Sequence, residues 1–132
     1  MRKTVEILDF ITVISNMNIE KWLNEFKTNW INKNVLRITE LFSDDIEYWE
    51  NPYKKLASLE EIKSEWLGIN NQDDIKVKTT VFLESEKRDC FTVLWELSYI
   101  LNGGKNSWAG VYLIKLNLQG QYYYFYQTGE RL

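Results

Sequence analysis

The sequence contains no histidine, one cysteine and one proline. Without an imidazole there is no Ser-His or Cys-His nucleophilic site, and a common zinc ligand is missing. The single cysteine, Cys90, permits neither an internal disulfide nor a thiolate metal cluster, and in a predicted strand it is expected to act as a small apolar side chain. We therefore expect no metal site, and nothing in the sequence indicates a cofactor.

A strong charge of one sign is also lacking. The formal net charge is -3, so no basic surface for nucleic acid or anionic lipid is expected. No window approaches the ~18 uninterrupted apolar residues of a membrane-spanning helix. Residues 1–17 begin with a basic tip, but Glu6 and Asp9 interrupt the apolar residues and no small-residue cleavage site follows, unlike a signal peptide. We expect a cytoplasmic protein that binds neither nucleic acid nor membranes.

Aromatic residues, by contrast, are abundant. They make up 15% of the chain and include six tryptophans. Rings bring large contact areas, so they either fill the core or line a cavity. A chain of 132 residues fits one domain that buries about two-thirds of its unfolded surface without a metal or a disulfide. We assign residues 18–132 to this domain and residues 1–17 to an N-terminal extension, a helix or an added edge strand, that packs on it.

Three helices are predicted in the first half of the domain. Asn18 is a suitable N-cap, and apolar residues at helical spacing continue to about Lys33. A second, short helix covers VLRITELF, residues 35–42. The third begins with the capping box of Ser58 and Glu61, and a glycine seven residues after that glutamate can close it.

The remaining segments follow the two-residue period of strands. One strand, residues 46–50, lies between the second and third helices. Four more follow the third helix, over residues 75–84, 90–101, 107–117 and 122–127, with NGG and LQG turns joining the last three. This order of elements predicts an α+β fold in which a curved antiparallel sheet wraps around the helices.

Two segments, together with this order of elements, resemble the nuclear transport factor 2-like superfamily, the cone-shaped fold of ketosteroid isomerases, scytalone dehydratases and SnoaL-like polyketide cyclases. The first is ITELFSDDIEYWENP, residues 38–52, in which a helix ending in Leu-Phe, an Asp pair, a strand and a proline follow one another. The second is LNLQGQYYYF, residues 116–125. The resemblance covers about residues 18–128 and implies a cone of sheet around about three N-terminal helices, open at its wide end.

The resemblance implies that the ketosteroid isomerase catalysts are largely missing. In those enzymes the residue before this proline is an Asp general base, and the matching residue is Asn51, which cannot take a proton at neutral pH. The tyrosine oxyanion donor falls on Phe26, and the protonated-acid donor falls near Tyr112. Losing one such donor costs about 3 kcal/mol of transition-state stabilisation, so isomerase chemistry of that type is not expected. The dehydratases and many cyclases depend on histidine, which is absent.

The proline and its neighbours have two interpretations. Pro52 withholds a ladder donor and holds Asn51 extended, so it ends the strand and leaves Glu50 and Asn51 at the sheet rim. Either Pro52 only terminates the strand, or Asn51 also hydrogen-bonds a ligand. Glu50 is the preferred catalytic candidate, because an acid in a ring-lined cavity has a raised pKa and can act as a base. Glu96 alternates with Trp95 and should point to the outer face.

Three functions remain open. The first is a protein that binds a small apolar or aromatic ligand without identifiable catalysis. The second is a cyclase-, isomerase- or hydratase-type enzyme that uses Glu50 with Tyr48 or Tyr112. The third is a scaffold whose outer sheet face binds a protein partner while the cone is filled. The candidates for the ligand-binding wall are Phe26, Tyr48, Asn51, Trp66, Trp95, Trp108 and Tyr112.

The last strand also predicts an assembly. The segment YYYFY, residues 122–126, should place rings alternately on both faces of the sheet, so one set is exposed or covered by another subunit. Members of the superfamily commonly dimerise through the outer face of the sheet. The resemblance therefore implies a homodimer formed through that face.

Overall fold

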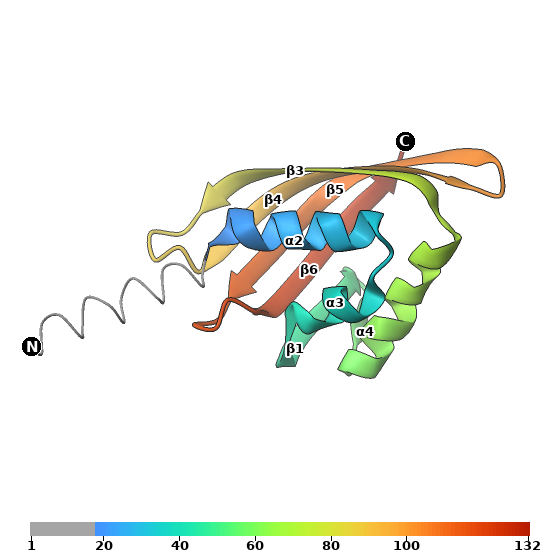
Figure 1. The fold of residues 1–132 in the computed structure, drawn as a ribbon. Coiled ribbons are helices and arrows are strands. Elements are labelled where there is room, and N and C mark those ends of the chain that lie inside the picture. Colours follow the sequence, from blue (N-terminus) through green and yellow to red (C-terminus); the bar gives the residue numbers. More distant parts are fainter. Residues whose placement is uncertain (1–17) are drawn as a thin grey trace, which may run out of the picture.

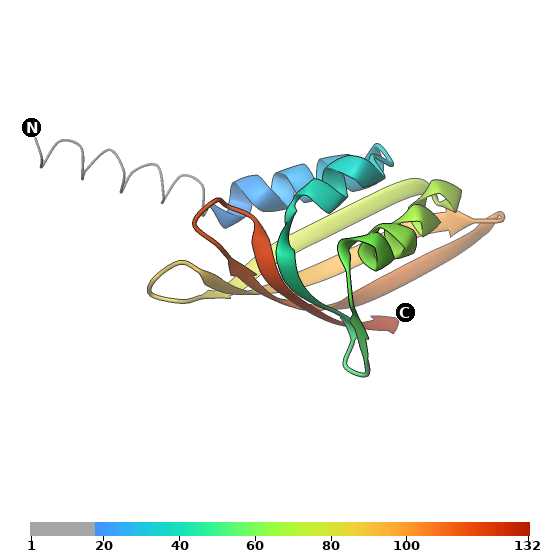
Figure 2. The same ribbon diagram turned by 90° about the horizontal axis from the view of Figure 1, so that it is seen from below.

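Three helices lie on one face of a curved six-stranded sheet in the structure, a computed structural model that describes residues 18–132 (Figures 1 and 2). The predicted packing of residues 1–17 lies outside the described residues. The helices are α2 (Ile19–Ile31), α3 (Val35–Glu40) and α4 (Leu59–Trp66), and a 3-10 helix, η1 (Leu67–Asn71), continues from α4.

The sheet has the order β2-β1-β6-β5-β4-β3. The predicted α+β class and the wrapping of a curved sheet around helices are confirmed. The sheet is mixed rather than wholly antiparallel, because β1 runs parallel to β6. A strand's own pattern does not record the direction of its neighbour, so the sequence could not reveal this pair. The strands are β1 (Phe42–Asn51), β2 (Lys54–Leu56), β3 (Asp73–Glu84), β4 (Cys90–Leu101), β5 (Gly104–Leu116) and β6 (Tyr122–Arg131).

The predicted helix starts are confirmed. Asn18 Oδ1 accepts a hydrogen bond from Lys21 N at 3.2 Å, and Ser58 Oγ accepts one from Glu61 N at 3.2 Å. The Glu61 carboxylate in turn accepts from Ala57 N at 2.7 Å. These side chains satisfy amide groups that have no partner within the helix, so α2 and α4 begin where the sequence indicates.

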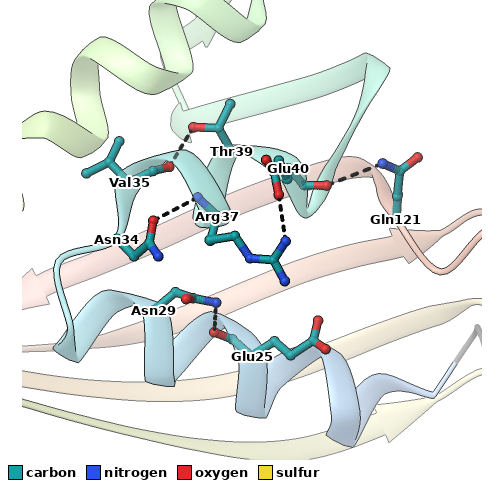
Figure 3. A network of polar contacts seen from close by, with 8 residues as sticks. All are labelled: Glu25, Asn29, Asn34, Val35, Arg37, Thr39, Glu40 and Gln121. Atoms are coloured by element: carbon teal, nitrogen blue, oxygen red, sulfur yellow. Dashed lines mark hydrogen bonds and ion pairs between the residues drawn. The ribbon is translucent and has the colours of Figure 1, made fainter.

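Helix α3 ends earlier than predicted. It stops at Glu40, and Phe42 already belongs to β1, where it pairs with Tyr122 and is buried. Figure 3 shows the polar contacts that hold α3 in place. Asn34 caps its first turn through Arg37 N at 3.2 Å, and Gln121 Nε2 donates to the Glu40 carbonyl oxygen at 3.3 Å. The helix is therefore tied to the turn before β6, next to the start of β1.

One end of the cone, the closed end, is filled by the rings of Trp22, Phe42, Tyr122 and Phe125. Trp22 stacks on Tyr122 with ring centroids 3.4 Å apart and planes 12° apart. Its indole Nε1 donates to the Leu41 carbonyl oxygen at 3.2 Å. These contacts bring α2 directly against β6 and the start of β1 at this end.

The last strand departs from strict alternation. Tyr122 and Phe125 are both fully buried although they are three residues apart. The register of β5 and β6 shifts at this point, since Lys115 pairs with Tyr124 while Leu116 pairs with Tyr122. The extra residue turns Phe125 back to the core, which the sequence pattern alone did not predict. Across residues 18–132, no helix has the length and apolar character needed to cross a bilayer.

Candidate functional site

A cavity of about 410 Å³ opens at the other end of the cone. This volume falls in the range of roughly 300–1,000 Å³ that is usual for small-molecule pockets. Its walls come from the end of α2, from α4 and η1, and from strands β1, β4, β5 and β6. The lining residues are Trp30, Tyr48, Glu50, Asn51, Glu65, Trp66, Ile69, Gln72, Trp95, Leu97, Tyr99, Trp108, Tyr112, Gln127 and Gly129.

Most residues proposed from the sequence meet at this cavity, but Phe26 does not. Phe26 is completely buried between the cavity wall and the closed end. Its ring is edge-to-face with Trp66 at 5.2 Å and with Tyr112 at 6.1 Å. It therefore supports the wall from behind. The proposed residues that line the cavity are Glu50, Tyr48, Asn51, Trp66, Trp95, Trp108 and Tyr112.

Glu50 supplies a carboxyl group inside this ring-lined space. Strand alternation on β1 places it on the same side as Tyr48, which is two residues earlier. Burial, followed by the negative charge of Glu65, raises the pKa of Glu50 to about 7, while Lys54 and the Tyr48 hydroxyl oppose the shift. Gln127 Nε2 donates to the Glu50 carbonyl oxygen at 2.8 Å and so joins β6 to β1 beside the carboxyl.

Two tyrosine hydroxyls accompany this carboxyl. Tyr48 and Tyr112 are almost fully buried, and burial, followed by the negative charge of Glu50, raises the pKa of both. Both hydroxyls therefore stay protonated and can donate hydrogen bonds. The Trp66 indole lies close enough to lower the Tyr48 pKa, yet the two groups do not reach hydrogen-bond geometry. Within residues 18–132, the buried Nε1 atoms of Trp66 and Trp95 have no hydrogen-bond partner.

An ion pair links β2 to α4 at the rim of the cavity. Lys54 Nζ lies 3.0 Å from Glu65 Oε1. The hydrogen bond and the charge of Glu65 raise the pKa of Lys54. On another side of the cavity, Trp30 Nε1 donates to Gln72 Oε1 at 3.2 Å and so links α2 to the residue after η1. These contacts hold α4 and η1 against the rest of the cavity wall.

Asn51 lies at the exposed edge of the cavity. Its Oδ1 accepts a hydrogen bond from Tyr53 N at 2.8 Å, which forms the turn between β1 and β2. Strand β1 ends at Asn51, directly before Pro52, so the predicted strand end is confirmed. The side-chain oxygen of Asn51 is already engaged in this turn. A contact between the Asn51 side chain and a ligand stays a prediction.

Gly129 is a lining residue that sequence reasoning missed. A Cβ atom at this position would lie 2.7 Å from Trp95 Cζ2 and 2.9 Å from Trp95 Cη2. The absence of a side chain therefore makes room for the Trp95 indole, which stacks on Tyr112 at 5.4 Å. No local signal in β6 could have shown this, because the contact joins two strands that are not adjacent in the sheet.

Other lining residues had different signals. Leu97 and Tyr99 share the face of Trp95 at two-residue spacing, so alternation along β4 predicts that they face the helices, and both line the cavity. Glu65 directly precedes Trp66 on α4, but its distance from Glu50 follows only from the packing of α4 on β1. Glu96 is exposed on the outer face, as predicted. Among residues 18–132, no three acidic or thiol side chains lie close enough to hold a metal ion.

Comparison with known proteins identifies the fold. No protein-family model matches the sequence, and no curated protein matches it. A solved NTF2-like protein of unknown function from Exiguobacterium sp. 255-15 is similar, with 19% identity over 83% of this chain and 98% of that chain and a TM-score of 0.69. A putative scytalone dehydratase from Novosphingobium aromaticivorans is similar as well, with 11% identity over 86% of this chain and 85% of that chain and a TM-score of 0.72.

A putative polyketide cyclase from Xanthomonas campestris is also similar, with 8% identity over 82% of this chain and 87% of that chain and a TM-score of 0.69. At these identities the comparisons establish the architecture alone. The chain has the nuclear transport factor 2-like fold, as the sequence resemblance implied.

Proposed function

We propose that this protein is an isomerase-, cyclase- or hydratase-type enzyme that binds a small, largely apolar molecule in the cavity and transfers a proton through Glu50. The observation that carries the proposal is a half-buried carboxyl in a ring-lined cavity beside two buried tyrosines. Its pKa of about 7 places both protonation states within reach at neutral pH, which suits a general acid–base group.

The residues present support a simple proton transfer. The Glu50 carboxylate takes a proton from a carbon next to a carbonyl group, and the C–H electron pair moves into the carbonyl as an enolate forms. The hydroxyl of Tyr112 or Tyr48 donates a hydrogen bond to the developing oxyanion and keeps its own proton, because its pKa is raised. Where the substrate has a C=C bond conjugated with this enolate, protonated Glu50 then returns the proton to the far carbon of the dienolate, the C=C bond shifts and the carbonyl re-forms.

The position of this carboxyl also bears on the family resemblance. Asn51 matches the general base of ketosteroid isomerases, but it cannot accept a proton. Glu50 is the preceding residue, lines the same cavity and has a raised pKa. Similar solved structures include a putative scytalone dehydratase and a putative polyketide cyclase, which supports the choice of reaction class. Replacement of the base by its neighbour would retain acid–base chemistry on a different residue.

Binding can be tested first. We expect small steroids or polyketide-like aromatics to quench the intrinsic tryptophan fluorescence saturably. Trp66→Ala should weaken this quenching because the indole forms part of the wall. Trp49→Ala is the matched control, since Trp49 pairs with the outer-face ring of Tyr126 and does not line the cavity.

Catalysis can be tested by deuterium exchange at the carbon next to the carbonyl of 2-tetralone in D2O, followed by NMR. Glu50→Gln should slow the protein-dependent exchange by about 100-fold or more. Tyr112→Phe should slow it by about tenfold or more. Glu96→Gln makes the same chemical change on the outer face and should leave the rate unchanged. Equal rates for the wild type and Glu50→Gln would refute the catalytic role, and saturable quenching would then indicate a binding protein.

We also propose a homodimer that forms through the outer face of the sheet. Leu83, Leu94 and Leu113 are 60%, 41% and 40% exposed there. Glu47 and Lys115 both pair with Tyr124 on this face, so the face carries both signs of charge and can complement a second copy of itself. Leu113→Asp should convert a dimer into a monomer in light scattering, whereas Leu118→Asp, in the β5–β6 turn, should not. A wild-type monomer at micromolar concentration would rule the dimer out.

A further inference from the structure

We propose that the ligand of this cavity is an organic cation, whose ammonium group binds between the indole rings and Glu50. The cavity is the one described above, so the proposal rests on the proposed function and names the substrate class for it. Neither the fold nor the similar structures specify the charge of a ligand, so the assignment comes from the side chains in the wall.

The wall is rich in the ring type that binds cations best. Four of the six tryptophans line the cavity, and they come from α2, α4, β4 and β5. Trp30 and Trp66 meet edge-to-face, with centroids 4.8 Å apart and planes 87° apart, and so form two adjoining walls. Indole faces attract ammonium groups more strongly than the other aromatic rings do, especially where water is excluded. The fourth indole, Trp108, is only half-buried.

The charge of the wall is negative. Among residues 18–132, its only charged lining residues are Glu50 and Glu65, and the lining part of this range includes no lysine or arginine. Lys54 neutralises Glu65 through the 3.0 Å ion pair at the rim. Within residues 18–132, Glu50 forms no ion pair, although its carboxyl is half-buried. A cationic ligand would supply the missing opposite charge, whereas an anionic ligand would approach the unpaired Glu50 carboxylate.

A bound cation would also fit the proposed chemistry. An ammonium group close to Glu50 favours its ionised form, and this is the form that accepts a proton from the substrate. The tyrosine hydroxyls remain neutral donors and can still bind a carbonyl oxygen on the same molecule. We therefore expect a substrate that combines a basic nitrogen with a ring or carbonyl-containing body.

The test compares three probes of similar size by isothermal titration calorimetry. Benzyltrimethylammonium is permanently cationic, N,N-dimethylbenzamide is neutral and phenylacetate is anionic. At about pH 8, we expect the cation to bind about tenfold or more tightly than the neutral probe, and the anion to bind most weakly. Glu50→Gln should reduce the advantage of the cation to about twofold. Glu96→Gln removes the same charge from the outer face and should preserve the advantage.

The pH dependence provides a measurement that needs no variant. The titratable groups that influence Glu50 are Glu65, Lys54, Tyr48 and Tyr112, and the sequence contains no histidine. Because the Glu50 pKa is about 7, the ionised fraction should rise about tenfold between about pH 6 and pH 8, and the affinity for the cation should rise about threefold because the neutral form still binds weakly. The affinity for N,N-dimethylbenzamide should not change.

Three outcomes would overturn the proposal: equal affinities for the cation and the neutral probe, no measurable binding of the cation, or a cation advantage that Glu50→Gln leaves intact. The proposed function fails separately, through the 2-tetralone experiment. If Glu50→Gln abolishes exchange while the cation shows no advantage, the enzyme proposal stands and the cationic substrate class is wrong. If the cation binds as expected without any exchange in the wild type, the site recognises ammonium ligands and the catalytic role is wrong.

Discussion

At the closed end of the cone, Trp22 stacks on Tyr122 with 3.4 Å between ring centroids, while at the open end Trp30 and Trp66 stand around a cavity of about 410 Å³. Both ends are built mainly from aromatic side chains, so composition does not explain the difference. At the closed end the Trp22 ring of α2 lies flat against Tyr122 of β6 and meets Phe42 of β1 edge-to-face. At the open end Trp30 meets Trp66 edge-to-face, and both rings line the cavity.

Polar groups separate the two ends further. The open end contains Glu50, Gln72 and Gln127 among its lining residues. Among the closed-end rings, the Tyr122 hydroxyl is buried and has no hydrogen-bond partner within the described residues. The comparison shows that stacked and edge-to-face pairs occur at both ends, so the distance of the helix rings from the sheet, and not the pairing geometry, decides whether an aromatic set fills or lines a space. It also shows that the Glu50 carboxyl, the proposed proton-transfer group, lies at the end that stays open.

The largest change in stability is expected at Phe26, which lies between the closed end and the open end. Phe26 contacts Trp22 on one side and Trp66 on the other, and it is completely buried. Phe26→Ala should lower the free energy of unfolding by about 3–5 kcal/mol, because it leaves a void between both ring sets. Trp108→Ala at the half-buried mouth should cost less than half of that. Urea denaturation of both variants measures the difference.

Equal losses for the two variants would contradict the division into a filled end and an open end. The control is Tyr53→Ala, because Tyr53 is 95% exposed in the β1–β2 turn. It should leave the free energy of unfolding almost unchanged.

The second test concerns the one carboxyl at the open end. The folded-state pKa of Glu50, about 7, lies above its ordinary value of 4.5, so the folded state binds the proton more tightly. Its stabilising effect is complete below about pH 4.5 and is lost as the pH rises through about 7. Over this interval the free energy of unfolding should fall by about 2 kcal/mol, less than the full shift implies because the carboxyl is partly solvated.

Comparison with variants isolates the Glu50 contribution from that of other acids. Glu50→Gln should abolish this fall, so the variant should be more stable than the wild type at about pH 8 and not at about pH 4.5. Glu96→Gln should retain the wild-type slope. Denaturant titrations at several pH values would contradict the assignment if the wild type and Glu50→Gln had parallel profiles.

The smallest change in stability is expected at Gly129 in the cavity wall. Gly129→Ala should push the Trp95 indole towards the cavity, because the new Cβ would lie 2.7 Å from its ring. We expect a loss of about 1 kcal/mol in the free energy of unfolding and a several-fold weaker affinity for a bound probe. Gly68→Ala is the matched control, since a Cβ there meets nothing within 4 Å. An unchanged affinity in Gly129→Ala would mean that Trp95 does not shape the bound state.

Local interactions made several elements predictable. The Ser58–Glu61 capping box defined the start of α4, and the two-residue period of β4 placed Trp95 inward and Glu96 outward. Pro52 marked the end of β1 because it cannot donate a ladder hydrogen bond. These features depend on residues close together in the chain, so the sequence contains their full physical cause.

Only the tertiary structure decided how these elements form a site. The parallel pairing of β1 with β6 depends on strands far apart in the chain, and it lets Gln127 reach the Glu50 backbone. Burial of Glu50 in the cavity, followed by the approach of Glu65 from α4, raises the pKa of Glu50, and both causes depend on how α4 packs on β1. The sequence by itself determined where α2 and α4 begin, the alternation of the long strands and the abundance of rings. The packing of α4 on the sheet decided which rings line a cavity and which carboxyl it contains, because burial and charge depend on neighbours in space.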